Sequence, residues 1–124
     1  MTASGCASGA ERGGEDNLRA DAAPAFAACL AAVVGHFRRK EGITFGSVSP
    51  LNEPDGACRR VAGSCQEGSC TSLTTQEAVI AALTRALAGT GAAVSGTEAN
   101  SMDAMTGYLA QMGVASLDAL GQPF

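Results

Sequence analysis

The stretch that decides the fold reads Ile43-Thr44-Phe45-Gly46-Ser47-Val48-Ser49-Pro50-Leu51-Asn52-Glu53-Pro54. Its first half is apolar and β-branched, which is typical of a strand, and its second half ends in a carboxylate between an amide and a proline. Enzymes built from alternating strands and helices place their acid–base residues at the carboxyl end of a strand in this way. A functional interpretation of the chain therefore depends on Glu53.

An amphipathic helix is predicted immediately before this strand. Asp21 is placed to cap it, Pro24 fits its first turn, and Gly42 supplies its carboxyl-terminal cap. Its apolar positions recur at helical spacing: Phe26, Cys29, Leu30, Val33, Val34 and Phe37. The strand itself is then predicted over residues 43–48.

A second helix is predicted after a long loop over residues 55–72. Thr74-Thr75-Gln76-Glu77 has the form of a capping box, and Leu73 is placed as the hydrophobic staple. The apolar stripe of this helix comprises Val79, Ile80, Leu83 and Leu87. Gly89 and Gly91 end the helix.

A second strand is predicted over residues 92–97, and it leads into another carboxylate, Glu98. Ser101 is placed to cap a third helix. The apolar positions of that helix are Met105, Leu109 and Met112. Strands that alternate with helices pair in parallel, so their carboxyl ends point the same way. We therefore expect Glu53 and Glu98 to share one rim of the sheet.

Composition and charge exclude several functional classes. The chain has 124 residues and a formal net charge of −4, whereas a nucleic-acid partner requires clustered Lys and Arg. The basic run Arg38-Arg39-Lys40 falls at the end of the first predicted helix, where cations complement the helix dipole. No segment approaches the roughly 18 apolar residues that span a bilayer, and residues 1–5 lack the features of a signal peptide. We expect no nucleic-acid partner and no membrane partner.

The five cysteines are an odd number. Cys29 falls on the apolar face of the first helix, where it is expected to behave as a small hydrophobe. Cys58, Cys65 and Cys70 lie together in the Gly-rich loop, where a disulfide can form. A zinc site is the alternative, but the chain lacks a tight Cys-x-x-Cys pair and His36 lies off the apolar stripe. We expect no metal site.

These residues resemble glycoside hydrolase family 30, and within it the endo-β-1,6-galactanase-like branch. The motifs that carry the resemblance are, in chain order, Ser4-Gly5-Cys6, Asp16-Asn17-Leu18, Val33-Val34-Gly35-His36-Phe37, Ser49-Pro50-Leu51-Asn52-Glu53-Pro54 and Gln66-Glu67-Gly68. The similarity extends from about residue 2 to residue 113. An Asn-Glu-Pro motif alone is common, whereas these motifs in this order are specific.

The resemblance implies a (β/α)8 barrel in which residues 43–48 are strand four and residues 92–97 are strand five. It assigns Glu53 as the general acid/base, and it assigns Asn52 to a hydrogen bond with the sugar hydroxyl next to the reacting carbon. The implied reaction is hydrolysis, with retention, of a β-linked galactan or related polysaccharide. The resemblance implies neither a cofactor nor a metal.

A retaining glycosidase needs a second carboxyl group about 5–5.5 Å from the first, and no residue here matches the family's nucleophile. Glu98 is the other carboxylate of the rim, because neighbouring parallel strands lie about 4.8 Å apart. By the resemblance, however, Glu98 belongs to the wall of the cleft. Substrate contact or a solvated turn is favoured over a nucleophilic role. The tryptophans with which the family stacks on sugars are replaced by Asp55-Gly56-Ala57-Cys58-Arg59-Arg60.

The prediction is an α/β fold that forms an incomplete segment of a (β/α)8 TIM barrel. Residues 1–20 are expected as a loop, 21–113 as β/α units and 114–124 as a tail. The predicted function is a glycosidase fragment that carries the acid/base but not the nucleophile and is inactive alone. Two alternatives stay open: a non-catalytic carbohydrate-binding or interaction remnant, and a small α/β domain in which Glu53 only caps a turn. The resemblance implies secretion, although the chain shows no leader.

Overall fold

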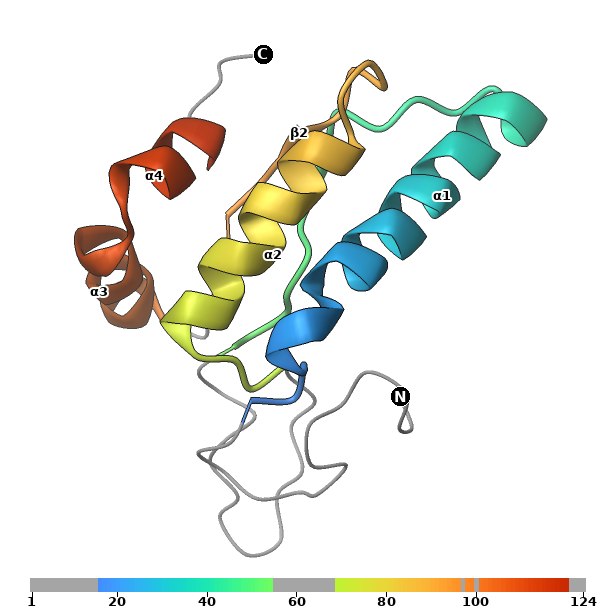
Figure 1. Ribbon diagram of the computed structural model, residues 1–124. Helices are drawn as coiled ribbons and strands as arrows, with labels where there is room; N and C mark the ends of the chain where they lie inside the picture. The colour runs from blue at the N-terminus through green and yellow to red at the C-terminus, as the bar shows by residue number, and fades with distance from the viewer. Residues whose placement is uncertain (1–15, 55–68, 97, 100, 121–124) are drawn as a thin grey trace, which may run out of the picture.

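The computed structural model describes residues 16–54, 69–96, 98–99 and 101–120 (Figure 1). The elements are a 3-10 turn η1 (Ala20–Ala22), α1 (Ala23–Glu41), β1 (Ser47–Val48), α2 (Leu73–Ala86), β2 (Ala93–Val94), α3 (Met102–Gln111) and α4 (Val114–Leu120). Helices and strands alternate as predicted as far as α3. Helix α4 lies within the residues that were predicted as a tail.

The two strands form a parallel sheet, as the alternation of helices and strands predicts. Ser47 pairs with Ala93 and Val48 pairs with Val94. Both strands are shorter than predicted: residues 43–46 lie outside β1, residues 92, 95 and 96 lie outside β2, and Thr97 is outside the described residues. The reason is that β2 begins only at Ala93, so residues 43–45 have no strand opposite them. The fold is therefore a mixed α/β arrangement with a short parallel sheet.

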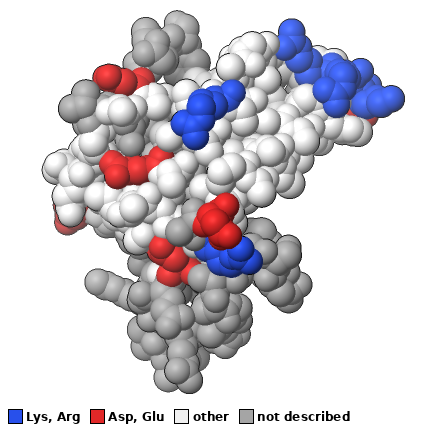
Figure 2. Space-filling view, in the orientation of Figure 1, with Lys and Arg blue, Asp and Glu red and all other residues white. Residues whose placement is uncertain are grey.

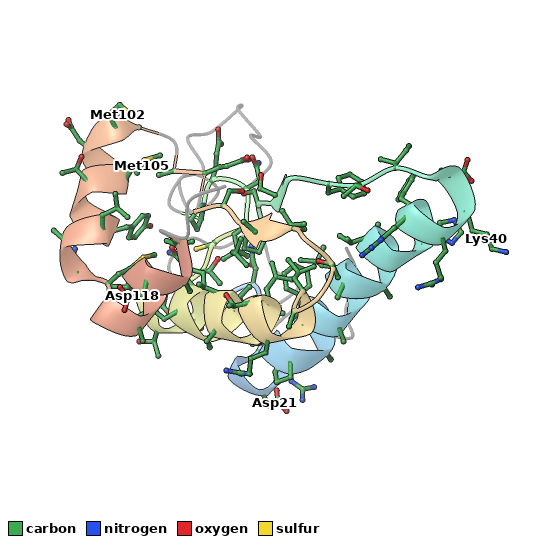
Figure 3. All side chains as sticks on the ribbon, turned by 90° about the horizontal axis from the view of Figure 1, so that it is seen from above. Asp21, Lys40, Met102, Met105 and Asp118 are labelled. Carbon is green, nitrogen blue, oxygen red and sulfur yellow. The ribbon has the colours of Figure 1, made fainter. Side chains whose placement is uncertain are left out.

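Helices α1 and α2 lie side by side, run in the same direction and cover one side of the sheet (Figures 1 and 3). Successive side chains of a strand point to opposite faces. Val48 and Val94 pack into the core under the helices, so Ser47 and Ala93 lie on the other face. Both helices begin at the end of the molecule where the strands finish (Figure 1), which is the geometry of successive β/α units.

Helix α2 supplies the centre of the core. The apolar stripe predicted for it is confirmed, because Val79, Ile80 and Leu83 are each 0% exposed and Leu87 is 3% exposed. Burial of a large aliphatic side chain contributes about 1.5–3 kcal/mol. The stability of the fold thus depends on α2 more than on any other element of the described chain.

Helix α1 meets the core along a narrower strip than its sequence predicts. Ala23, Ala27 and Val34 are buried, whereas Val33 is 47% exposed. Cys29 is a free thiol on the exposed side, so its predicted place in the apolar face is wrong. The side of α1 that packs on the core carries Ala23, Ala27 and Val34, which share clusters with residues of α2. Val33 and Cys29 lie outside this side of the helix and are exposed.

The ends of the helices were predicted with mixed success. Asp21 does not cap α1, because its carboxylate pairs with Arg19 at 2.5 Å and the N-cap is Ala22 without a side-chain bond. Gly42 ends α1 with φ 68°, as predicted. Ser101 caps α3, as predicted, by accepting a hydrogen bond from the N–H of Ala104.

The predicted capping box of α2 is wrong by two positions. Ser72 is the N-cap, and its hydroxyl oxygen accepts a hydrogen bond from the N–H of Thr75. Leu73 consequently lies in the first turn instead of preceding the cap. The apolar positions predicted for α3 are less buried than those of α2. Leu109 is 42% exposed, whereas Met112, which follows the helix, is buried.

Candidate active site at the carboxyl ends of the strands

The predicted rim residues lie together beyond the ends of β1 and β2. A parallel bridge pairs Asn52 with Glu98. The N–H of Glu53 donates to the carbonyl oxygen of Glu98 at 2.7 Å, and the N–H of Glu98 donates to the carbonyl oxygen of Leu51 at 3.3 Å. Asn52 and Glu98 are exposed, and Glu53 is half-buried. The structure thus brings all three residues to the same edge.

A second segment of chain, Ser69 to Ser72, lies along the other side of the same turn. The N–H of Ser69 donates to the carbonyl oxygen of Asn52 at 2.7 Å, and the N–H of Thr71 donates to the carbonyl oxygen of Pro54 at 3.2 Å. The residues immediately before and after Glu53 are therefore both fixed by this segment. The sequence predicts only an irregular loop here.

The backbone of Glu53 itself has an unusual conformation. Its φ is 42°, and it is the one non-glycine residue with a positive φ in the described part of the chain. Such a conformation costs about 1–3 kcal/mol and persists only where the surroundings enforce it, which is a recurrent property of functional sites. Pro54, the next residue, has a fully buried side chain that anchors the turn.

The Ser69–Ser72 segment is in turn fixed from below by α2. The Nε2 of Gln76 donates to the carbonyl oxygen of Thr71 at 3.0 Å, and the Thr71 hydroxyl donates to the carbonyl oxygen of Ser69. Gln76 is 0% exposed. The sequence signal that was missed is a long polar side chain one turn before Val79 and Ile80, on the face that α2 buries.

Asp16 fixes the same segment from its outer end. Its carboxylate accepts hydrogen bonds from the backbone N–H of Ser72, from the Ser72 hydroxyl at 2.8 Å and from the Thr75 hydroxyl at 2.5 Å. Desolvation acts to raise the pKa of Asp16, but the hydrogen bonds from Thr75 and Ser72 outweigh it and hold the pKa below its usual value. Asp16 thus accepts hydrogen bonds at the N-terminus of α2, although it lies 56 residues before Ser72 in the sequence.

Cys70 lies in the centre of the Ser69–Ser72 segment. Its carbonyl oxygen accepts a 2.7 Å hydrogen bond from the N–H of Asn17. The side chain is buried and disulfide-bonded. Its partner cysteine lies outside the described residues, and the predicted candidates Cys58 and Cys65 also lie there. The disulfide adds a covalent restraint to the segment that holds the rim.

A comparison with protein families decides the family of this chain. The sequence model of O-glycosyl hydrolase family 30 matches residues 1–115. The chain belongs to O-glycosyl hydrolase family 30. Neither the search of curated proteins nor the search of solved structures found a match. Membership of this family makes the chain glycosidase-like and indicates a carbohydrate as its substrate.

One run of basic side chains in this family 30 chain lies at the end of α1 that is remote from the rim. Figure 2 shows them over the carboxyl-terminal end of α1, where Arg38, Arg39 and Lys40 occupy the last turn. The guanidinium of Arg38 donates to the carbonyl oxygens of Gly89 at 3.4 Å and Thr90 at 3.1 Å. Arg38 therefore holds the turn between α2 and β2, and the run as a whole complements the end of the α1 dipole.

Two further findings concern only the described part of the family 30 chain. It contains no group of three or more His, Cys, Asp or Glu side chains arranged to hold a metal ion. None of its helices is long and apolar enough to cross a bilayer.

Proposed function

We propose that this chain is part of a retaining endo-β-1,6-galactanase-like hydrolase with a (β/α)8 barrel, and that Glu53 is its general acid/base. The observation that carries the proposal is the position of Glu53. It follows a parallel strand, and its backbone has a positive φ enforced by chain segments on both sides. Catalytic groups of (β/α) enzymes are supplied from the carboxyl ends of several strands.

In the first step the carboxyl proton of Glu53 passes to the glycosidic oxygen as the bond from that oxygen to the anomeric carbon breaks. A second carboxylate bonds to the anomeric carbon at the same time. In the second step water attacks that carbon, gives its proton to Glu53 and releases the nucleophile. Glu53 is therefore an acid and then a base, and the configuration of the sugar is retained.

The neighbouring rim residues have supporting roles in this proposal. Asn52 is exposed next to Glu53, and we assign its amide to the sugar hydroxyl beside the reacting carbon, a contact that strengthens in the transition state. Glu98 is exposed and joined to Glu53 through the backbone, and we assign it to substrate contact. The nucleophile is assigned to a later strand of the same barrel.

The test is the cleavage of β-1,6-galactan by the full-length protein that contains this segment. Glu53→Gln keeps the shape of the side chain and removes the proton donor, so the rate is expected to fall by about 10²–10⁴-fold. Glu98→Gln is the matched control, and it is expected to raise KM with little effect on kcat. NMR of the first product formed is expected to show the β anomer.

An active protein whose rate is unchanged by Glu53→Gln would refute the assignment of the acid/base. A wild-type protein that binds galactan without cleaving it would favour the non-catalytic carbohydrate-binding function. A first product with the α anomer would exclude the retaining mechanism and leave the family assignment intact.

A further inference from the structure

The turn that carries Glu53 is held by the Ser69–Ser72 segment, and a buried side chain of α2 is one of the groups that hold this segment. Ser69 and Thr71 bond to the carbonyl oxygens of Asn52 and Pro54, on either side of Glu53. The carbonyl oxygen of Thr71 accepts a 3.0 Å hydrogen bond from Nε2 of Gln76. A continuous series of bonds thus runs from the core of α2 to the residue that follows Glu53.

Gln76 is an unfavourable choice for this position if packing is its only role. The side chain is 0% exposed, and its Oε1 is buried without a hydrogen-bond partner among the described residues. A buried polar atom without a partner is costly. Methionine has a similar length and would fill the same space without an unpartnered oxygen of its own, so the bond from Nε2 to Thr71 is what the amide adds. A function beyond packing would explain why an amide occupies the site.

We propose that Gln76 is a positioning residue for Glu53, an inference that rests on the proposed function. By fixing the carbonyl group of Thr71, Gln76 keeps the Thr71 N–H directed at Pro54 and so holds Glu53 at its positive φ. Without this bond the turn relaxes toward negative φ, and the carboxyl group moves away from the glycosidic oxygen. Displacement of a reacting group by about 1 Å can reduce a rate by about a hundredfold.

The test uses two substrates that differ in their need for an acid. Cleavage of β-1,6-galactan requires protonation of the leaving oxygen, because an alkoxide is a poor leaving group. The dinitrophenyl glycoside of the β-1,6-linked galactose disaccharide releases a stable phenolate and needs no proton. For both substrates kcat/KM covers the steps up to formation of the glycosyl-enzyme, so their ratio reports how well Glu53 acts as an acid.

In the full-length protein, Gln76→Met is expected to reduce kcat/KM for galactan by about tenfold to a hundredfold and to leave the value for the dinitrophenyl glycoside nearly unchanged. Its melting temperature is expected to stay close to that of the wild type, because the substitution removes the unpartnered Oε1 but leaves the carbonyl oxygen of Thr71 without its donor. Gln76→Asn keeps the amide but shortens its reach, and the same selective loss is expected. Gln111→Met is the matched control, since Nε2 of Gln111 makes a comparable 2.8 Å bond to the carbonyl oxygen of Gly107 on exposed α3.

The outcomes separate the two proposals. If Glu53→Gln loses activity only on galactan while Gln76→Met loses activity equally on both substrates, or on neither, the positioning role is refuted and the proposed function stands. If Glu53→Gln does not discriminate between the substrates, the proposed function is wrong and the positioning role falls with it. A selective loss in Gln111→Met as large as that in Gln76→Met would also refute the inference.

Discussion

The backbone N–H of Glu53 lies 2.7 Å from the carbonyl oxygen of Glu98 and donates a hydrogen bond to it. The two carboxylate residues that end neighbouring strands are therefore connected through their main chains, whatever their side chains do. Substitution of the Glu98 side chain leaves this connection in place. The conformation of Glu53, with φ 42°, is thus a property of the backbone network at the rim.

This conformation predicts that glycine at position 53 is more stable than alanine, the opposite of the usual order. Glu53→Gly is expected to be about 1 kcal/mol more stable to unfolding than Glu53→Ala, because glycine adopts a positive φ without a clash of Cβ. Urea denaturation of the two variants measures the difference. At Glu98 the order is expected to reverse, with glycine about 0.5–1 kcal/mol less stable than alanine. A Glu53→Ala variant more stable than Glu53→Gly would show that the Glu53 backbone is not strained.

The contacts of Asp16 predict a role in stability for a residue outside the regular elements. Asp16→Ala is expected to lower the free energy of unfolding by about 1 kcal/mol, since the N-terminus of α2 loses a charged acceptor. Asp21→Ala is the control, because that carboxylate pairs with exposed Arg19, two residues before it in sequence. No change in melting temperature is expected for it. Equal effects of the two substitutions would contradict this role for Asp16.

The lowered pKa of Asp16 also predicts how this contribution varies with pH. Hydrogen bonds from Thr75 and Ser72 outweigh desolvation and place the pKa in the folded protein below that in the unfolded chain. The stabilisation is then complete above the unfolded pKa of about 3.9 and is lost as pH falls through the folded pKa. The stability difference between wild type and Asp16→Asn should shrink as the solution is acidified below about pH 5. A stability difference that widens on acidification would contradict the lowered pKa of Asp16.

The burial of α2 predicts where the core is most sensitive. Leu83→Ala is expected to reduce the free energy of unfolding by about 2–5 kcal/mol, because Leu83 is 0% exposed and its truncation leaves a cavity. Leu109→Ala on α3 is the matched control and is expected to cost about 1 kcal/mol or less, since Leu109 is 42% exposed. Thermal unfolding followed by circular dichroism tests both. A larger loss of unfolding free energy in Leu109→Ala than in Leu83→Ala would contradict the central place of α2 in the core.

The sequence predicted those features that depend on neighbouring residues. The stripe Val79, Ile80 and Leu83 is buried because helical periodicity alone places these side chains on one face. Gly42 and Ser101 act as caps because their conformational and hydrogen-bonding properties suit helix ends. Parallel pairing followed from the alternation of helices and strands, and it brought Glu53 beside Glu98 as predicted.

The features that the sequence did not predict depend on distant partners. Asp21 has a residue type suited to a cap, but its carboxylate pairs with Arg19. The cap of α2 is Ser72, whereas Thr74 was predicted. The bonds from Asp16 to Ser72 join residues 56 apart, and no local pattern signals them. Gln76 was part of a predicted capping motif, although its actual bond is to a carbonyl group five residues earlier.

The backbone bonds at the rim have a consequence for deuterium exchange. The amide protons of Asn17, Glu53, Ser69 and Thr71 each donate to a carbonyl group on a different stretch of chain, although none of these residues belongs to a regular strand. Amides that open only together exchange together. These four should form one slowly exchanging group, and the end of the fold that carries the rim should open as a unit instead of fraying one residue at a time.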